Sequence, residues 1–142
     1  MMSRQTIRYQ TQWAAQFYVA AELTRRGYLA SLTLGNAPVA DLLVVSPGQT
    51  QFMVDVKGQS TRNFWLIQRR EPRPDLFFVL VYLPKNYEPP RFYILSCAEL
   101  MEKREEYKRH IEAIGGKYDD KVGGINWSTV LEYEDRWHVL PA

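Results

Sequence analysis

Two acidic side chains and one lysine interrupt segments that otherwise have the pattern of β-strands. Asp41 lies within the apolar run 39–45, and Asp55 and Lys57 lie in the strictly alternating segment 51–57. A charge on a sheet face costs several kcal/mol unless it is paired or bound to a metal. We therefore expect these three residues to have partners, and their types indicate which chemistry those partners would serve.

Asp55 and Lys57 are two residues apart on one predicted strand, so both project from the same face about 7 Å apart. If segments 39–45 and 51–57 form a hairpin, Asp41 joins that face from the neighbouring strand. Two carboxylates and the carbonyl of Val56 form an all-oxygen site suited to Mg²⁺ or Mn²⁺. A lysine there can orient an attacking water and stabilise charge on a phosphoryl group, which is the chemistry of phosphodiester hydrolysis.

The elements that must position these residues follow an α/β pattern. Apolar residues at helical spacing predict an N-terminal helix capped by Thr11, and opposed charges at helical spacing predict a second helix capped by Ser96. Alternating and continuous apolar runs predict strands, and the most apolar one is expected to be central and buried on both faces. The predicted helices span 12–26 and 98–114, and the predicted strands span 28–34, 39–45, 51–57, 64–68, 76–83 and 91–95.

Length and composition predict one globular domain over residues 1–142. Hydrophobic residues make up 46% and charged residues 24%, which excludes a disordered or collagen-like chain. Cys97 is the only cysteine, so no internal disulfide forms and a buried thiol is expected. No apolar run approaches the roughly 18 to 20 residues that span a bilayer, so we expect a cytoplasmic protein without a membrane partner.

The spacing of Asp41 and Asp55-Val56-Lys57 resembles the PD-(D/E)XK nuclease superfamily, which includes restriction endonucleases and Holliday junction resolvases. The resemblance covers about residues 12–95. It implies a mixed sheet flanked by helices, with a restriction-endonuclease-like αβββαβ core to which the helix and tail of 96–142 are added. It also implies a Mg²⁺- or Mn²⁺-dependent endonuclease-like hydrolase that acts on nucleic acid, with DNA expected.

The same resemblance assigns roles to individual residues. Asp41 and Asp55 would bind the metal together with the Val56 carbonyl, and Lys57 would be the catalytic lysine. Gln59 lies where several branches of the superfamily place a polar residue after the lysine. A homodimer is one arrangement that would let so small a domain reach both strands of a duplex.

Three features depart from the superfamily pattern. Gln16 stands where many members carry a metal-binding Glu on the first helix, and an amide oxygen brings no charge. Glu22, the only acid on that helix, would replace it if the helix were rotated or displaced. The proline usual before the first Asp is displaced to Pro38, and the helix expected before the strand at 76–83 is compressed into 58–75.

That compressed span is basic and predicts contacts with nucleic-acid phosphates, because arginine pairs with phosphate through two hydrogen bonds. A solvated loop is the alternative. The four candidate residues are Arg62, Arg69, Arg70 and Arg73.

Other functions remain open at this level. Asp41, Asp55 and Lys57 could face solvent at a sheet edge, or pair with one another or with an arginine. The fold could also be a degenerate nuclease that binds nucleic acid or protein without cleavage, because Gln16 replaces an acid. A small structural protein follows if the three charged residues do not lie together.

Overall fold

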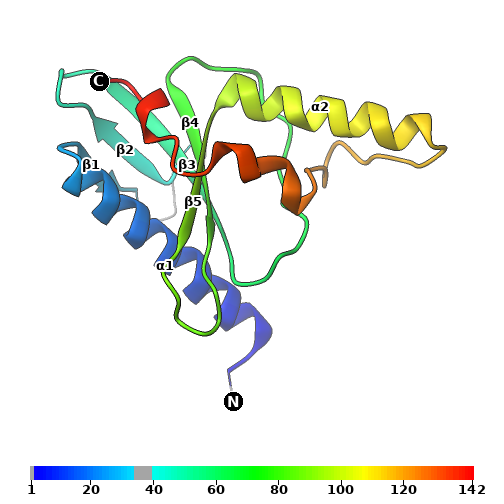
Figure 1. Cartoon of the computed structure of the whole chain (residues 1–142), viewed down its shortest axis with the longest axis horizontal. Helices are drawn as coiled ribbons and strands as arrows, with labels where there is room; N and C mark the ends of the chain where they lie inside the picture. The colour runs from blue at the N-terminus through cyan, green and yellow to red at the C-terminus, as the bar shows by residue number, and fades with distance from the viewer. Residues whose placement is uncertain (1, 34–39) are drawn as a thin grey trace.

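Two long helices lie on opposite faces of a five-stranded sheet in the computed structural model, which describes residues 2–33 and 40–142 (Figure 1). The expected α/β architecture is confirmed at this level. The helices are α1 (Arg4–Arg25) and α2 (Cys97–Ala113), the strands are β1 (Leu29–Leu32), β2 (Leu42–Val45), β3 (Gln51–Gln59), β4 (Leu76–Tyr82) and β5 (Arg91–Ser96), and the 3₁₀ helices are η1 (Trp127–Tyr133) and η2 (Trp137–Val139).

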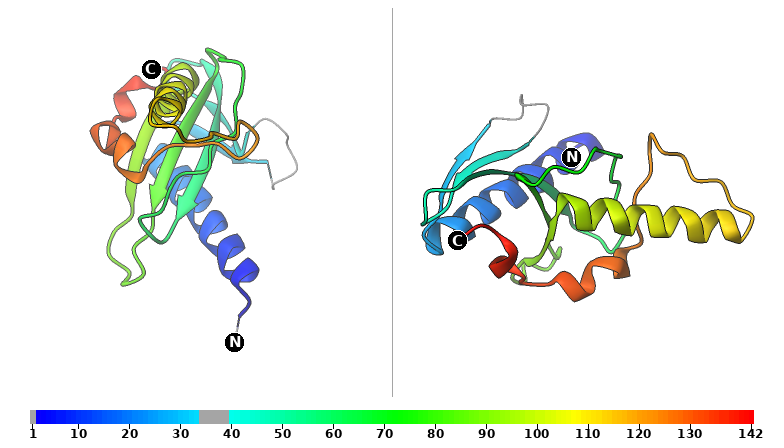
Figure 2. Two further views of the ribbon diagram at one scale, coloured as in Figure 1. Left: turned by 90° about the vertical axis from the view of Figure 1, so that its right-hand side faces the viewer. Right: turned by 90° about the horizontal axis from the view of Figure 1, so that it is seen from above.

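The strands lie side by side in chain order, and only the β3–β4 pair is parallel. β2 and β3 form the predicted antiparallel hairpin, in a register that places Leu42 opposite Val54. The connection between β3 and β4 contains no helix at residues 60–75. The chain instead crosses the face of the sheet as an extended loop before it enters β4 (Figure 2).

The predicted strand at 64–68 is wrong. Only Trp65 pairs, through reciprocal backbone hydrogen bonds of 2.9 and 3.0 Å with Ile125. The apolar character of this segment serves burial rather than sheet formation, because Trp65 and Ile67 pack into the core beside α2. Trp65 is thus a core residue, as its type predicts.

β4 is an interior strand between β3 and β5 and is buried on both faces, as its composition predicts, although β3 is the central strand of the five. Alternate side chains face two hydrophobic cores, with Val79 on the α1 side and Phe78 on the α2 side. On the α1 side, Val19 contributes to the core, and on the α2 side Leu100 does so. Burial of apolar surface on both faces makes β3 and β4 a rigid base for the polar residues at their edges.

α1 begins at Arg4 rather than at Gln12, and Ser3 rather than Thr11 caps it. The Ser3 side chain accepts a hydrogen bond from the Thr6 backbone N–H, whereas the Thr11 hydroxyl donates to the Ile7 carbonyl inside the helix. The first turns of α1 project beyond the sheet (Figure 1). α2 has the predicted Ser96 cap, completed by Glu99 as a capping box.

Asp41 directly precedes β2, whereas Pro38 and the first residue of the predicted strand 39–45 lie outside the described residues. The C-terminal segment packs against the α1 side of the sheet through Trp137 and Leu140. Tyr28 donates a hydrogen bond of 2.7 Å to the Pro141 carbonyl, which holds this segment beside β1. Over the described residues, neither helix has the length and apolar character needed to cross a membrane.

Candidate functional site

Asp55 lies between two cations on β3 and the following loop. Asp55 is 4% exposed, and its Oδ1 lies 3.1 Å from Lys57 Nζ while its Oδ2 accepts a 2.7 Å hydrogen bond from Arg70 Nη2. Lys57 projects from the same face as Asp55, as the alternating pattern predicts. The local pairing that the sequence left open is therefore present, and Arg70 is the arginine that supplies it.

Asp41 caps the open edge of β3. The β2–β3 ladder ends at Asp41, whose backbone N–H donates to the Val54 carbonyl at 3.0 Å. Asp41 Oδ2 then accepts a 2.7 Å hydrogen bond from the Val56 N–H, which the ladder leaves without a strand partner. Asp41 is thus held at the residue between Asp55 and Lys57, and the three charged residues lie together.

Two glutamines one turn apart on α1 also form hydrogen bonds at this edge of β3. Gln16 is 4% exposed, and its Nε2 donates to Asp41 Oδ1 at 3.3 Å. Gln12 binds the β3 backbone twice, because its Nε2 donates to the Val56 carbonyl at 2.7 Å and its Oε1 accepts from the Gly58 N–H at 3.0 Å. The sequence reasoning missed Gln12, although its four-residue spacing from Gln16 places both on one helix face.

Gly58 allows α1 to approach β3 this closely. A Cβ atom at Gly58 would lie 2.6 Å from the Ala15 Cβ, so any larger residue would push the helix away from the strand. The glycine therefore keeps Gln12 and Gln16 within reach of the β3 edge.

Burial raises the pKa of Asp41, and the neighbouring charge of Asp55 raises it further. The hydrogen bond from the Val56 N–H and the positive charges of Lys57 and Arg70 act in the opposite direction. All four charged groups thus interact electrostatically. We call Asp41, Asp55, Lys57, Arg70 and Gln16 the carboxylate cluster.

Asp41→Asn is expected to raise the free energy of unfolding by about 1 kcal/mol at neutral pH. Asparagine keeps an acceptor for the Val56 N–H, removes the desolvated charge and can offer an N–H to Gln16. Well below 3.8, the ordinary pKa of the carboxyl group, Asp41 is protonated in the folded and unfolded states, so the penalty is absent. The penalty grows as the pH rises and is complete above the raised pKa of the folded state.

Urea unfolding of both proteins at neutral pH and at about pH 3 measures this difference. The gain in stability should be largest at neutral pH and shrink in acid. If Asp41→Asn were less stable than the wild type at neutral pH, the inference that the desolvated charge of Asp41 destabilises the fold would be contradicted.

The oxygen donors of the carboxylate cluster match a hard divalent cation in type. Gln16 Oε1 is buried and accepts no hydrogen bond from the described residues, so it can serve as a ligand beside Asp41, to which the same amide donates. Residues 2–33 and 40–142 contain no group of three or more His, Cys, Asp or Glu side chains that could hold a metal. A cation here would therefore have two acids, and it would compete with Arg70 for Asp55.

The structure does not bring the other predicted residues into the cluster. Glu22 binds Arg25 and Arg26 on the surface of α1, at 2.9 and 3.3 Å. Gln59 lies at the end of β3, where its Nε2 donates to the Asn63 carbonyl at 3.2 Å.

Of the four predicted arginines, only Arg70 lies in the carboxylate cluster. Arg69 pairs with Glu71 at 3.8 Å, and Arg73 pairs with Asp75 at 2.9 Å, on the loop that leads into β4. Arg62 lies over the Tyr82 ring, with its guanidinium carbon 5.8 Å from the ring centroid.

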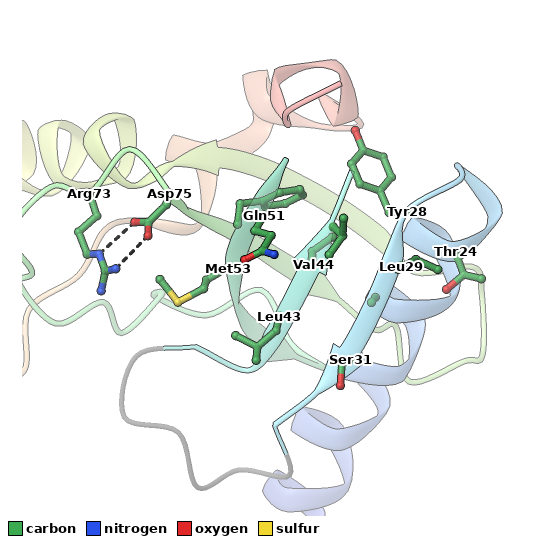
Figure 3. A pocket seen from close by; sticks show the side chains of 13 residues that line it. Thr24, Tyr28, Leu29, Ser31, Leu43, Val44, Gln51, Met53, Arg73 and Asp75 are labelled. Carbon is green, nitrogen blue, oxygen red and sulfur yellow. Dashed lines mark hydrogen bonds and ion pairs between the residues drawn. The ribbon is translucent and has the colours of Figure 1, made fainter. Parts of the chain in front are cut away.

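Two large hollows flank β3. A groove of about 620 Å³ opens beside Lys57, between the first turns of α1 and residues 57–66. The second hollow, of about 680 Å³, lies on the outer face of β1 to β3, and Figure 3 shows Leu43 and Met53 projecting into it. The Arg73–Asp75 pair lies at its side, so this second hollow offers apolar surface and no unpaired titratable group from the residues that line it.

Comparisons with models of protein families, with curated proteins and with solved structures each found no match to this chain.

Proposed function

We propose that this chain hydrolyses phosphodiester bonds of nucleic acid in a metal-dependent reaction at the carboxylate cluster. The observation that carries the proposal is the position of three charged residues around Val56. Asp41 binds the Val56 backbone N–H, and Asp55 and Lys57 are the neighbours of Val56 on β3. Two acids and one lysine from adjacent strands, brought to one point at a sheet edge, form the arrangement that this chemistry requires.

The topology supports the same proposal. A helix precedes the mixed sheet, Asp41 stands at the start of β2, and Asp55 and Lys57 stand in the antiparallel neighbour β3. This order agrees with the first part of the αβββαβ core of PD-(D/E)XK nucleases, which the sequence resembles. The helix before β4 is missing, and a loop takes its place.

The acidic and the basic residues of the cluster would have different roles. Asp41, Asp55 and the amide oxygen of Gln16 would hold a divalent cation, which would neutralise phosphoryl charge and lower the pKa of a bound water. Lys57 is 37% exposed at the groove, so its ammonium can hold a negative phosphoryl oxygen there. Gln12 keeps the β3 edge in place through its two hydrogen bonds to the backbone.

The Arg70–Asp55 ion pair favours a second candidate function, which is binding of nucleic acid without cleavage. Arg70 already supplies Asp55 with a positive charge at 2.7 Å. If that pair persists in the presence of metal, the carboxylate cluster is a structural ion-pair network and the chain is a degenerate nuclease fold.

Calorimetric titration of Mg²⁺ and Mn²⁺ into the wild type and Arg70→Gln separates these candidates. If Asp55 is a metal ligand, removing its competitor should tighten binding of the divalent cation by about tenfold, which corresponds to about 1.4 kcal/mol. Arg69→Gln is the matched control, because it removes the same charge from the same loop without touching Asp55. Absence of metal binding at millimolar concentrations in both folded proteins would overturn the metal-dependent mechanism and favour the second candidate.

A further inference from the structure

Two hollows adjoin at the end of the sheet where β3 and β4 terminate. The groove beside Lys57 and a second one of about 500 Å³ share Ser60 and Thr61 in their walls. The second groove continues to the β4–β5 loop, residues 83–90. Figure 1 shows the first turns of α1 and the β4–β5 loop at this same end of the molecule.

The walls of these adjoining grooves are strongly basic. Five basic side chains line them, against one acid, Glu88. We call the five residues the basic track: Arg8, Lys57, Arg62, Lys85 and Arg91. Basic side chains along one groove attract a ligand with repeated negative charges rather than a single anion.

Lys57 and Arg91 are paired with Asp55 and Glu134, but the other three cations of the track differ in pairing from Arg69 and Arg73 in the loop before β4. Arg8, Arg62 and Lys85 form no ion pair with any carboxylate in the described part of the chain, whereas Arg69 and Arg73 each have an acid close in sequence. A paired arginine must give up its carboxylate before it binds a phosphate, and an unpaired one need not. The observed pairing therefore favours the track over the loop for phosphate contacts.

Exposed aromatic rings accompany these charges. Tyr87 is 97% exposed in the β4–β5 loop, between the groove residues Asn86 and Glu88. Its φ of 62° is in the left-handed region, which is unfavourable for a tyrosine. Phe64 lines the groove beside Lys57 and is also exposed. Aromatic rings beside a basic groove bind unpaired bases by stacking.

We propose that the basic track binds the phosphodiester backbone of a single-stranded nucleic acid and leads it across Ser60 and Thr61 to Lys57. The choice of ligand rests on the proposed function, because the track ends at the carboxylate cluster. The backbone chemistry is common to DNA and RNA, and stacking on Tyr87 assigns the single-stranded form.

Fluorescence anisotropy with labelled 15-nucleotide DNA and RNA strands, in buffer with EDTA, tests binding without any cleavage. Arg62→Gln/Lys85→Gln should weaken binding of a single strand at least tenfold at low salt. It should also reduce the slope of log affinity against log salt by about 1.4, the value for two lost phosphate contacts. The control Arg109→Gln/Lys121→Gln removes the same charge from two exposed residues that line neither groove, and it should stay within twofold of the wild type.

Tyr87→Ala tests the single-stranded form. Loss of stacking should weaken binding of single strands about tenfold and leave a 15-base-pair duplex unaffected. Equal losses for both substrates would overturn the single-stranded assignment. Comparison of the DNA and RNA strands identifies which backbone the track prefers.

Two results would overturn the track itself. One is absence of binding by the wild type at low salt, and the other is a larger loss for Arg69→Gln/Arg73→Gln than for Arg62→Gln/Lys85→Gln. A protein that binds along the track but cleaves no strand with any divalent metal would instead overturn the proposed hydrolysis and leave the track standing.

Discussion

Asp55→Asn is expected to reduce metal-dependent cleavage of nucleic acid by about 10³-fold while the chain remains folded. Asparagine preserves the shape of the side chain and removes the charge that would hold a divalent cation beside Asp41. It also releases Lys57 and Arg70, which keep access to water, so the fold survives the change. Alanine is a harsher substitution, because it would add a void to the loss of both ion pairs.

The measurement is the initial rate of cleavage of labelled strands in Mg²⁺ or Mn²⁺, with circular dichroism to verify folding. Asp75→Asn is the matched control, because Asp75 is also paired with an arginine but lies on the exposed loop before β4. The control should keep the wild-type rate. A folded Asp55→Asn variant with full activity would rule out the carboxylate cluster as the catalytic centre.

Arg104→Met is expected to lower the free energy of unfolding by about 1–3 kcal/mol. Arg104 is 1% exposed on α2, and its Nε donates to the Ile67 carbonyl at 2.7 Å. Its guanidinium also donates to the Asp120 carboxylate at 3.0 Å and to the Asp120 carbonyl at 2.6 Å. Methionine fills similar space but leaves the buried Ile67 carbonyl without its donor, and it removes one of the contacts that hold the loop carrying Arg70.

Urea unfolding followed by tryptophan fluorescence measures this loss. Arg109→Met is the control on the same helix, because Arg109 is exposed and its replacement should change stability by less than about 0.5 kcal/mol. Equal stability of the two variants would show that water satisfies the partners of Arg104, which would contradict a structural role for this arginine.

Local patterns in the sequence determined much of the sheet and the helices. Strict alternation at 51–57 predicted β3 and the shared face of Asp55 and Lys57, because successive side chains of a strand project to opposite sides. The continuous apolar run at 76–83 predicted β4 as a strand buried on both faces. Ser96 as a helix cap predicted the start of α2, since a cap and its helix are neighbours in sequence.

Local patterns predicted the structure less well where the same residues are compatible with two different local structures. The Trp65 segment is apolar and short, so it has the composition of a strand, yet its single backbone pairing is with Ile125, sixty residues away in the chain. Ser3 and Thr11 are both residue types that cap helices. The burial of the turns after Thr11 is compatible with a helix that begins at either residue, so it did not decide between them.

Only the tertiary structure decided which polar groups meet. Arg70 and Asp55 are fifteen residues apart, and whether that arginine turns to the acid or to solvent depends on the loop that Arg104 anchors. Gln12 reaches β3 because Gly58 lets the helix approach, which no spacing within either segment reveals. Periodicity reports which face a side chain occupies, but pairing between distant segments depends on how the whole chain packs, and that packing brought the candidate site together.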